Sequence, residues 1–297
     1  MVNETFDYVK YLDVKKNIDD RSLNITVWDR FTNWILSQNQ LDSSLKVLEI
    51  GAGIGTMIER LLDASLLKYC HYIALEPESS FKNAAKLRLM TWAGAQGASF
   101  EIKPEGSWQL HGMELDVTIE WVKAEADKID QLFANENFDL ILSHAVIDLL
   151  PVPEIMPKIL NKLKQDSCFY FSVNFSGETK FLPSDESDAD IANNYHKDMD
   201  ARFPGLDWQP SRTGEALPIW LENYGCKKVI RGKSDWNLGS KNHDAEDALF
   251  IENILDTIQK ALKDMPGLNV WLAKRYRQLE QEQLEIKISN SDCFGLK

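Results

Sequence analysis

Cysteine is scarce in this sequence, and its spacing does not suit a metal site or a disulfide framework. The 297 residues include four cysteines that lie far apart and form no Cys-x-x-Cys pair: Cys70, Cys168, Cys226 and Cys293. Zinc sites and disulfide-rich folds need closer or more regular spacing, so we expect reduced thiols and no bound metal. Reduced thiols are typical of the cytoplasm, which is the expected location.

Positive charge and long apolar runs are also lacking. The chain has 33 lysines and arginines against 46 aspartates and glutamates, so its net charge is −13. Nucleic acids and anionic membranes attract proteins through basic surfaces, and this balance argues against both as partners. No apolar run approaches the ~20 residues that a membrane helix requires. The segment Met1–Asp7 has neither the basic start nor the apolar stretch of a signal peptide.

The sequence does contain a regular alternation of short apolar segments with helical patterns. We predict core strands at residues 46–50, 72–76, 117–122, 138–143, 168–173, 227–230 and 284–288, and helices at 57–62, 81–92, 153–163 and 217–224. Strands that are apolar throughout and alternate with helices are typical of a parallel sheet covered by helices on both faces. Within 98–123, a hairpin is predicted before the third of these strands.

Three segments fall outside this alternation. Residues 4–38 are predicted to be helical, with Asn24 as the cap of a second helix. Residues 177–210 hold eight acidic residues against three basic ones, and their run 185–190 is interpreted as a solvated loop. Residues 244–282 are predicted to form two helices that break at Pro266-Gly267.

We expect these segments to form a roof over the functional site, because a sheet that binds a ligand at its edge needs a cover that excludes water. At least two of the segments 4–24, 177–210 and 244–282 are expected to line one cavity. The predicted organisation is an N-terminal helical lid at 1–40 and one domain at 41–297, with inserts at 177–210 and 244–282.

The informative motif is a glycine-rich stretch between the first strand and the helix that follows it. Gly51, Gly53 and Gly55 come after Glu49, and their missing side chains let the backbone turn sharply and approach a ligand. A dinucleotide fingerprint would place its third glycine at position 56, which is Thr56. An acid followed by G-x-G-x-G instead resembles the first motif of the class I S-adenosylmethionine-dependent methyltransferases.

Three further features fall where that family has its other motifs. Glu76 ends the second strand, 21 residues after Gly55. Residues Ala124–Asp127 follow the third strand, and 138–144 resemble the fourth motif, which borders the reactive methyl group. The resemblance covers residues 45–175 well and implies an α/β fold, a Rossmann-like three-layer sandwich with a mostly parallel seven-stranded sheet. It also implies S-adenosyl-L-methionine as cofactor and S-adenosyl-L-homocysteine as product.

The resemblance places the cofactor around these motifs. Glu76 would hold the ribose hydroxyls, because a carboxylate accepts two hydrogen bonds side by side. An acid after the third strand would lie near the adenine. Glu125 is preferred there, since Asp127 could instead cap the next helix. Arg21 would pair with the methionine carboxylate, or it is a surface charge. The expected cofactor-binding residues are Glu49, Gly51, Ala52, Gly53, Gly55, Thr56, Glu76, Pro77, Glu125, Ala126, Ser143 and Arg21.

His144 is the candidate catalytic residue. It follows the fourth strand at its carboxyl end, where open α/β sheets bind ligands. A neutral imidazole could take a proton from the acceptor near pH 7. Alternatively it stacks against the cofactor or satisfies a backbone carbonyl, because many methyl transfers need positioning and no base. The expected substrate-binding residues, which otherwise are surface or packing groups, are Tyr11, Tyr195, His196 and Arg212.

Together these features predict a methyltransferase that acts on a small-molecule acceptor at oxygen, nitrogen or carbon. An RNA or protein methyltransferase is the runner-up, and the net charge argues against RNA. A non-catalytic cofactor-binding subunit or a nicotinamide oxidoreductase would also fit an α/β fold, because fold does not determine function. A third glycine at 55 and not at 56 argues against the oxidoreductase. The chain is expected to be a monomer or a homodimer.

Overall fold

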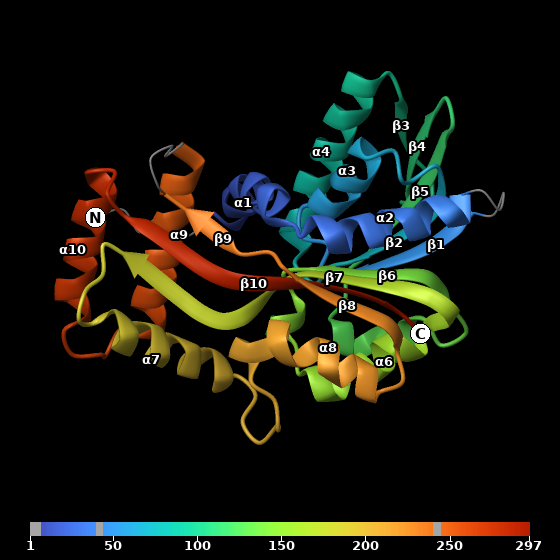
Figure 1. The fold of residues 1–297 in the computed structure, drawn as a ribbon. Coiled ribbons are helices and arrows are strands. Elements are labelled where there is room, and N and C mark those ends of the chain that lie inside the picture. Colours follow the sequence, from blue (N-terminus) through green and yellow to red (C-terminus); the bar gives the residue numbers. More distant parts are fainter. Residues whose placement is uncertain (1–6, 40–43, 240–244) are drawn as a thin grey trace.

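The computed structural model describes residues 7–39, 44–239 and 245–297. The predicted helical start at 4–6 and residue 244 of the last insert lie outside these residues. Ten strands among the described residues form one sheet (Figure 1): β1 (Leu45–Ile50), β2 (Tyr69–Leu75), β3 (Ser99–Ile102), β4 (Trp108–Gly112), β5 (Leu115–Val122), β6 (Phe138–His144), β7 (Leu163–Leu182), β8 (Lys227–Lys233), β9 (Trp236–Leu238) and β10 (Glu285–Leu296).

The helices follow the predicted pattern, and the cap at Asn24 is confirmed because its side chain accepts from Val27 N at 3.1 Å. Among the described residues, no helix combines the length and the apolar character needed to cross a membrane. The α-helices are α1 (Tyr8–Ser22), α2 (Ile25–Asn39), α3 (Thr56–Asp63), α4 (Ser79–Gln96), α5 (Ile129–Leu132), α6 (Val152–Asn161), α7 (Asp188–Asp200), α8 (Thr213–Asn223), α9 (Ala245–Ala261) and α10 (Leu268–Glu280). Short 3₁₀ helices are η1 (Ala126–Lys128), η2 (Ile147–Leu149) and η3 (Pro210–Arg212).

The strand order is β3-β4-β5-β2-β1-β6-β7-β10-β8, and β9 pairs with β10. From β5 to β7 all neighbours are parallel, and β10 runs antiparallel to β7 and β8. The predicted α/β fold class is therefore confirmed, with the seven core strands mostly parallel. The sheet has three strands beyond the predicted seven. The predicted hairpin is confirmed as β3–β4 and extends one edge of the sheet, and β9, which was not predicted, joins the outer part of β10.

Helices cover both faces of the sheet, as the apolar strands require (Figure 1). On one face α2, α3 and α4 bury residues such as Phe31, Leu61 and Leu89 against β1, β2 and β6. On the other face α5, α6 and α8 bury residues such as Ile159 and Leu217. β1 lies between β2 and β6, so the carboxyl ends of these three strands meet at one edge of the sheet.

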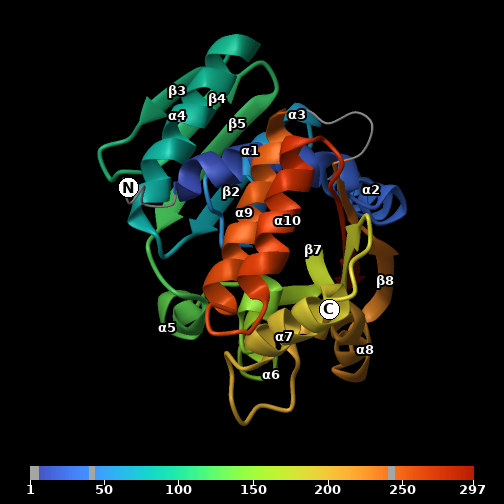
Figure 2. The same cartoon turned by 90° about the vertical axis from the view of Figure 1, so that its left-hand side faces the viewer.

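β7 and β10 are longer than predicted and continue past the other strands as an antiparallel pair. This extension packs with α1, α7, α9 and α10 in a third hydrophobic cluster (Figures 1 and 2). The sequence predicted β10 only at 284–288, because residues 289–293 are polar and look like a loop. In the structure Ser291 and Asp292 find hydrogen-bond partners within the fold, and the Ser291 hydroxyl donates to Gly214 O at 2.6 Å. The carboxylate of Asp292, for example, accepts hydrogen bonds from Asn24 N and Val173 N, both at 2.8 Å.

The interpretation of the acidic run 185–190 as a solvated loop is wrong in part: residues 185–187 precede α7 and Glu186 is exposed, but residues 188–190 are helical. Asp188 begins α7, and its carboxylate accepts a hydrogen bond from the Trp271 indole at 2.8 Å and pairs with Arg275, which is 0% exposed. Asp185 pairs with Lys274. The run therefore anchors α7 to α10. Sequence composition predicts solvation because it carries no information on cations that lie 87 residues away.

Candidate active site

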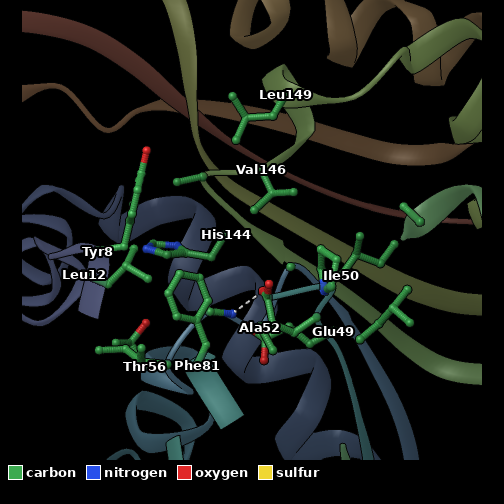
Figure 3. Close-up of a pocket in the computed structure, with 18 of the residues that line it drawn as sticks. Tyr8, Leu12, Glu49, Ile50, Ala52, Thr56, Phe81, His144, Val146 and Leu149 are labelled. Carbon is green, nitrogen blue, oxygen red and sulfur yellow. Dashed lines mark hydrogen bonds between the residues drawn. The ribbon is translucent and has the colours of Figure 1, made fainter. Parts of the chain in front are cut away.

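A cavity of about 420 Å³ lies at the edge where the carboxyl ends of β1, β2 and β6 meet. The glycine-rich loop forms its floor, segments after β2, β5 and β6 form its sides, and α1 covers it. Figure 3 shows Leu12, Phe81 and His144 among the side chains that line it. The lining residues are Tyr8, Tyr11, Leu12, Lys15, Asp19, Glu49, Ile50, Gly51, Ala52, Gly53, Ile54, Thr56, Leu75, Glu76, Pro77, Phe81, Ala124, Glu125, Ala126, His144, Ala145, Val146, Leu149 and Leu150.

The glycine-rich loop needs glycine for two different reasons. Gly51 has a φ of +71°, and a Cβ there would lie 2.6 Å from a methyl carbon of Val146, so the loop could not pass beneath the segment after β6. Gly53 has a φ of +54°, and a Cβ there would meet only Leu12, at 3.5 Å. The conformation favours glycine at 53, and the open space above it lets a ligand approach the backbone.

Glu76 connects the end of β2 to this loop. One carboxylate oxygen accepts from Gly53 N at 2.8 Å and the other accepts from Glu78 N at 2.9 Å. The side chain is 5% exposed, and burial raises its pKa above the ordinary value. Because a carboxylate has about four acceptor positions, Glu76 keeps capacity for a ligand after it has ordered the loop.

Glu49 lies deeper, at the end of β1. It is 1% exposed, and its carboxyl accepts from the Tyr72 hydroxyl at 2.8 Å. Burial raises the pKa of Glu49 to about 8, against the opposing effect of the Tyr72 hydrogen bond. The side chain is therefore mostly protonated at pH 7, and it presents a neutral acid to the cavity.

His144 ends β6 and is 9% exposed. Its Nδ1 lies 2.7 Å from Ser172 Oγ, and its Nε2 lies 2.8 Å from Asp19 Oδ2. Burial lowers the pKa of His144 to about 4, although the neighbouring Asp19 carboxylate opposes this shift. The imidazole is therefore neutral at pH 7, and both ring nitrogens are engaged in hydrogen bonds.

Sequence reasoning missed Lys15 and Asp19, which reach the cavity from α1. Lys15 is 6% exposed and Asp19 is 2% exposed, and the two side chains form an ion pair. A signal for them exists in the sequence, because residues 8, 11, 12, 15 and 19 follow the three- and four-residue spacing of one helix face. Residues 8, 11 and 12 carry side chains with large apolar surfaces, and a lysine and an aspartate on the same face indicate a buried pair.

More than half of the chain matches a known protein family. Residues 30–213 match the profile of a family described as "Putative S-adenosyl-L-methionine-dependent methyltransferase". The chain belongs to this family. Its cofactor is therefore S-adenosyl-L-methionine. No match was found among curated proteins.

The methyltransferase is also similar to solved structures. A Bacillus halodurans protein described as a "putative methyltransferase" has 12% identity and a TM-score of 0.49, covering 90% of this chain and 98% of that chain. The precorrin-6y C5,15-methyltransferase of Geobacter metallireducens has 13% identity and a TM-score of 0.42, covering 90% and 87%. The plantazolicin methyltransferase BpumL, in complex with SAH, has 13% identity and a TM-score of 0.40, covering 96% and 89%.

The structure brings most of the expected cofactor-binding residues of the methyltransferase to the cavity. Three of them lie outside its lining. Ser143 donates to Ile50 O at 3.1 Å, a Cβ at Gly55 would lie 3.3 Å from Ala85 of α4, and Arg21 pairs with Asp247 of α9. Those that line the cavity are Glu49, Gly51, Ala52, Gly53, Thr56, Glu76, Pro77, Glu125 and Ala126.

Some of the candidate acids after β5 and of the expected substrate-binding residues line the cavity, and others lie outside it. Glu125 lines the cavity, whereas the Asp127 carboxylate pairs with Lys128 at the surface. Of the substrate set, Tyr11 lines the cavity. His196 and Arg212 line a separate hollow of about 250 Å³ beside α7, and Tyr195 packs against the third hydrophobic cluster.

The expectation for the roof is wrong in one respect. Among the described residues, the segment 4–24 lines the cavity, but neither 177–210 nor 244–282 does. The last insert instead lies behind the helix that forms the roof, because Phe250 of α9 stacks on Tyr11 with ring centres 5.4 Å apart. The inserts form the third hydrophobic cluster because their apolar faces need a partner, and α1 with the β7–β10 extension provides it.

The residues of the cavity suit the cofactor of the family. The loop backbone is open above Gly53, the Glu76 carboxylate has acceptor capacity left, and the volume falls in the usual range for small-molecule sites, about 300–1,000 Å³. Among the residues that the structure describes, no group of three or more histidine, cysteine, aspartate or glutamate side chains could hold a metal ion.

Proposed function

We propose that this methyltransferase transfers the methyl group of its cofactor to a small-molecule acceptor, at an oxygen, nitrogen or carbon atom. The observation that carries the proposal is the cavity, which α1 covers and whose walls near His144 include Leu12, Val146 and Leu149. A covered cavity of about 420 Å³ that is also proposed to hold the cofactor favours a small acceptor over a folded macromolecule.

The cofactor-binding roles follow from where the side chains lie. Glu76 would accept the ribose hydroxyls with the positions that its backbone hydrogen bonds leave open. The backbone around Gly51 and Gly53 would approach the central part of the cofactor, and Glu125 with Ala126 would border the adenine. We assign the pairing with the methionine carboxylate to Lys15 and not to Arg21, because Lys15 lines the cavity.

When bound, the cofactor supplies a methyl group on a positively charged sulfur, which a nucleophile can attack in line. The part of the protein is to hold donor and acceptor close and to exclude water. In this proposal α1 excludes water, and His144 at the end of β6 is the catalytic candidate. Its two engaged nitrogens and lowered pKa support a role in positioning more than a role as general base.

Residues 1–40 are proposed as the lid, within which the two helices have different parts. α1 lines the cavity, while α2 buries Phe31 and Ile35 on the sheet and serves as an anchor. The protein is further proposed to work in the cytoplasm as a monomer or homodimer. The free state of its four cysteines supports this location.

The cofactor site is tested by ligand binding. Isothermal calorimetry is expected to show that the protein binds S-adenosyl-L-methionine and S-adenosyl-L-homocysteine and does not bind NAD, because the glycine spacing and Glu76 suit the sulfur cofactors. Tight binding of NAD without a response to either sulfur compound would contradict the proposed site.

The acceptor class needs a separate experiment. The protein is incubated with methyl-labelled cofactor and with cell extract separated into small-molecule, RNA and protein fractions. Label is expected in the small-molecule fraction, where mass spectrometry would identify the product, and a Glu76→Ala variant serves as the negative control. Label in RNA or protein would overturn the small-molecule proposal, and no transfer to any fraction would favour a non-catalytic cofactor-binding subunit.

A further inference from the structure

Asp19 lies where three elements meet at the wall of the cavity, namely α1, β6 and β9. It belongs to α1, and its carboxylate is buried, at 2% exposure. Oδ2 lies 2.8 Å from Nε2 of His144 at the end of β6, and it also accepts from Lys15 one helical turn earlier. Oδ1 accepts from the indole of Trp236 on β9 at 3.0 Å. One side chain thus joins the covering helix to two strands of the sheet.

The charges around Asp19 determine which atom of His144 carries the proton. Burial alone would raise the pKa of Asp19, but the Lys15 ammonium and His144 outweigh it and hold this pKa below the ordinary value. The carboxylate is therefore ionised at neutral pH and can only accept hydrogen bonds. His144 must then donate from Nε2, and its Nδ1 accepts from the Ser172 hydroxyl, 2.7 Å away. The surrounding groups leave one neutral tautomer of the ring.

A serine, a histidine and an aspartate in one chain of hydrogen bonds are also the arrangement of a hydrolase triad. Ser172 does not suit that role, because it is 0% exposed and is absent from the cavity lining. His144, Lys15 and Asp19 do line the cavity. The network is thus directed at the cavity through its histidine and its lysine, and not through its serine.

We propose that Asp19 is a positioning residue of this methyltransferase: it fixes the tautomer and orientation of His144, holds Lys15 beside it, and so couples binding in the cavity to the docking of α1. This inference rests on the proposed function for its meaning, since the cavity is taken to hold the cofactor. Without the Asp19 carboxylate, the imidazole of His144 loses its hydrogen-bond partner on α1, and the buried ammonium of Lys15 loses its counter-charge.

The test uses Asp19→Asn, which keeps the shape of the side chain. An asparagine can present either its oxygen or its NH₂ group to His144, so the tautomer is no longer dictated. In ¹⁵N-histidine NMR of the protein without ligand, the wild type is expected to show the Nε2–H tautomer at His144 from pH 6 to 8, and the variant a mixture. The His144→Gln variant identifies the signal. Calorimetry is expected to show at least a tenfold weaker affinity for S-adenosyl-L-homocysteine in Asp19→Asn.

Two further variants keep the result interpretable. Asp13→Asn makes the same chemical change on the same helix, where the side chain is 64% exposed, and it is expected to leave tautomer and affinity unchanged. Lys15→Met combined with Asp19→Asn removes both buried charges. We expect this double variant to fold but not to recover the single tautomer, which is read without ligand and so does not depend on the proposed binding role of Lys15.

An unchanged tautomer and an unchanged affinity in Asp19→Asn would overturn the proposal. Recovery of the Nε2–H tautomer in the double variant would also overturn it, because Asp19 would then act only by neutralising Lys15. The proposed function fails separately, if the wild type binds neither sulfur compound. The tautomer measurement still decides whether Asp19 positions His144 in that case, because it needs no ligand.

Discussion

Glu76 illustrates at the scale of one residue how the fold and the proposed site depend on the same atoms. Its two oxygens accept from Gly53 N and Glu78 N, so the carboxylate fixes the glycine-rich loop before any ligand arrives. An amide or a shorter acid at this position would lose part of this arrangement. The side chain is therefore expected to contribute to cofactor affinity both directly and through the loop.

Replacing Glu76 by alanine is expected to weaken cofactor binding at least tenfold while the protein still folds. Hydrogen bonds to a charged group contribute on the order of 1.5–3 kcal/mol each, and water compensates part of the loss. Calorimetry with S-adenosyl-L-homocysteine and circular dichroism check the two statements. Glu120→Ala, on the exposed face of β5, serves as the control. An unchanged dissociation constant would show that another group holds the ribose.

His144 yields a prediction about catalysis. Because both ring nitrogens are engaged and burial lowers its pKa to about 4, we expect His144→Ala and His144→Gln to change turnover less than threefold. The apparent Michaelis constant for the cofactor is expected to rise instead. Steady-state kinetics from pH 6 to 9 measure both. A general base would reveal itself by a turnover loss of roughly 10²–10⁴, partly recovered at high pH.

At the scale of elements, α7 and α10 are held together by a buried ion pair. Arg275 of α10 is fully buried between Phe181 and Trp271, and Asp188 at the start of α7 supplies its counter-charge. The same pair supports the third hydrophobic cluster, against which α1 packs. The inserts thus support the covering helix from behind, and they do so without reaching the cavity.

We expect Asp188→Ala to lower the free energy of unfolding by about 3–5 kcal/mol, because it leaves a buried guanidinium unpaired. Asp185→Ala is the matched control, since its partner Lys274 is half-exposed and such pairs contribute at most about 1 kcal/mol. Urea denaturation measures both. The double change Asp188→Leu with Arg275→Met should recover most of the loss. Equal effects of the two single variants would contradict the role of burial.

At the scale of the whole molecule, the buried acid Glu49 should make the free energy of unfolding depend on pH. The pKa of Glu49 is about 8 in the folded protein and 4.5 in a free side chain. Because the pKa is raised, the folded protein binds the proton of Glu49 more tightly than the unfolded chain does, and this proton stabilises the fold. The stabilisation is complete below pH 4.5 and is lost as the pH rises through 8. The loss amounts to at most about 1.4 kcal/mol per pH unit.

Glu49→Gln is expected to remove this dependence, because glutamine keeps an oxygen for the Tyr72 hydroxyl and cannot ionise. The difference in unfolding free energy between variant and wild type should therefore grow in favour of the variant from pH 5 to pH 8. Urea denaturation of the ligand-free protein at several pH values measures it, with the exposed Glu105→Gln as control. A difference that stays constant with pH would show that Glu49 is already ionised in the folded protein.

The sequence by itself determined the fold class, most of the core strands and helices, and the position of the glycine-rich loop. These follow from local patterns, namely apolar periodicity, helix caps and glycine spacing, which act between residues close in the chain. The residues of that loop and Glu76 do meet at one edge, because β1 and β2 are parallel neighbours whose carboxyl ends coincide.

Only the tertiary structure decided the contacts between distant segments. Asp19 and His144 are 125 residues apart, and Asp188 and Arg275 are 87 apart, so no local pattern pairs them. The same holds for the polar end of β10, which becomes a strand because Asn24 and Val173 donate to Asp292. Buried charges and polar strands are stable only beside their partners, and which partners come within hydrogen-bonding distance depends on how the helices pack on the sheet.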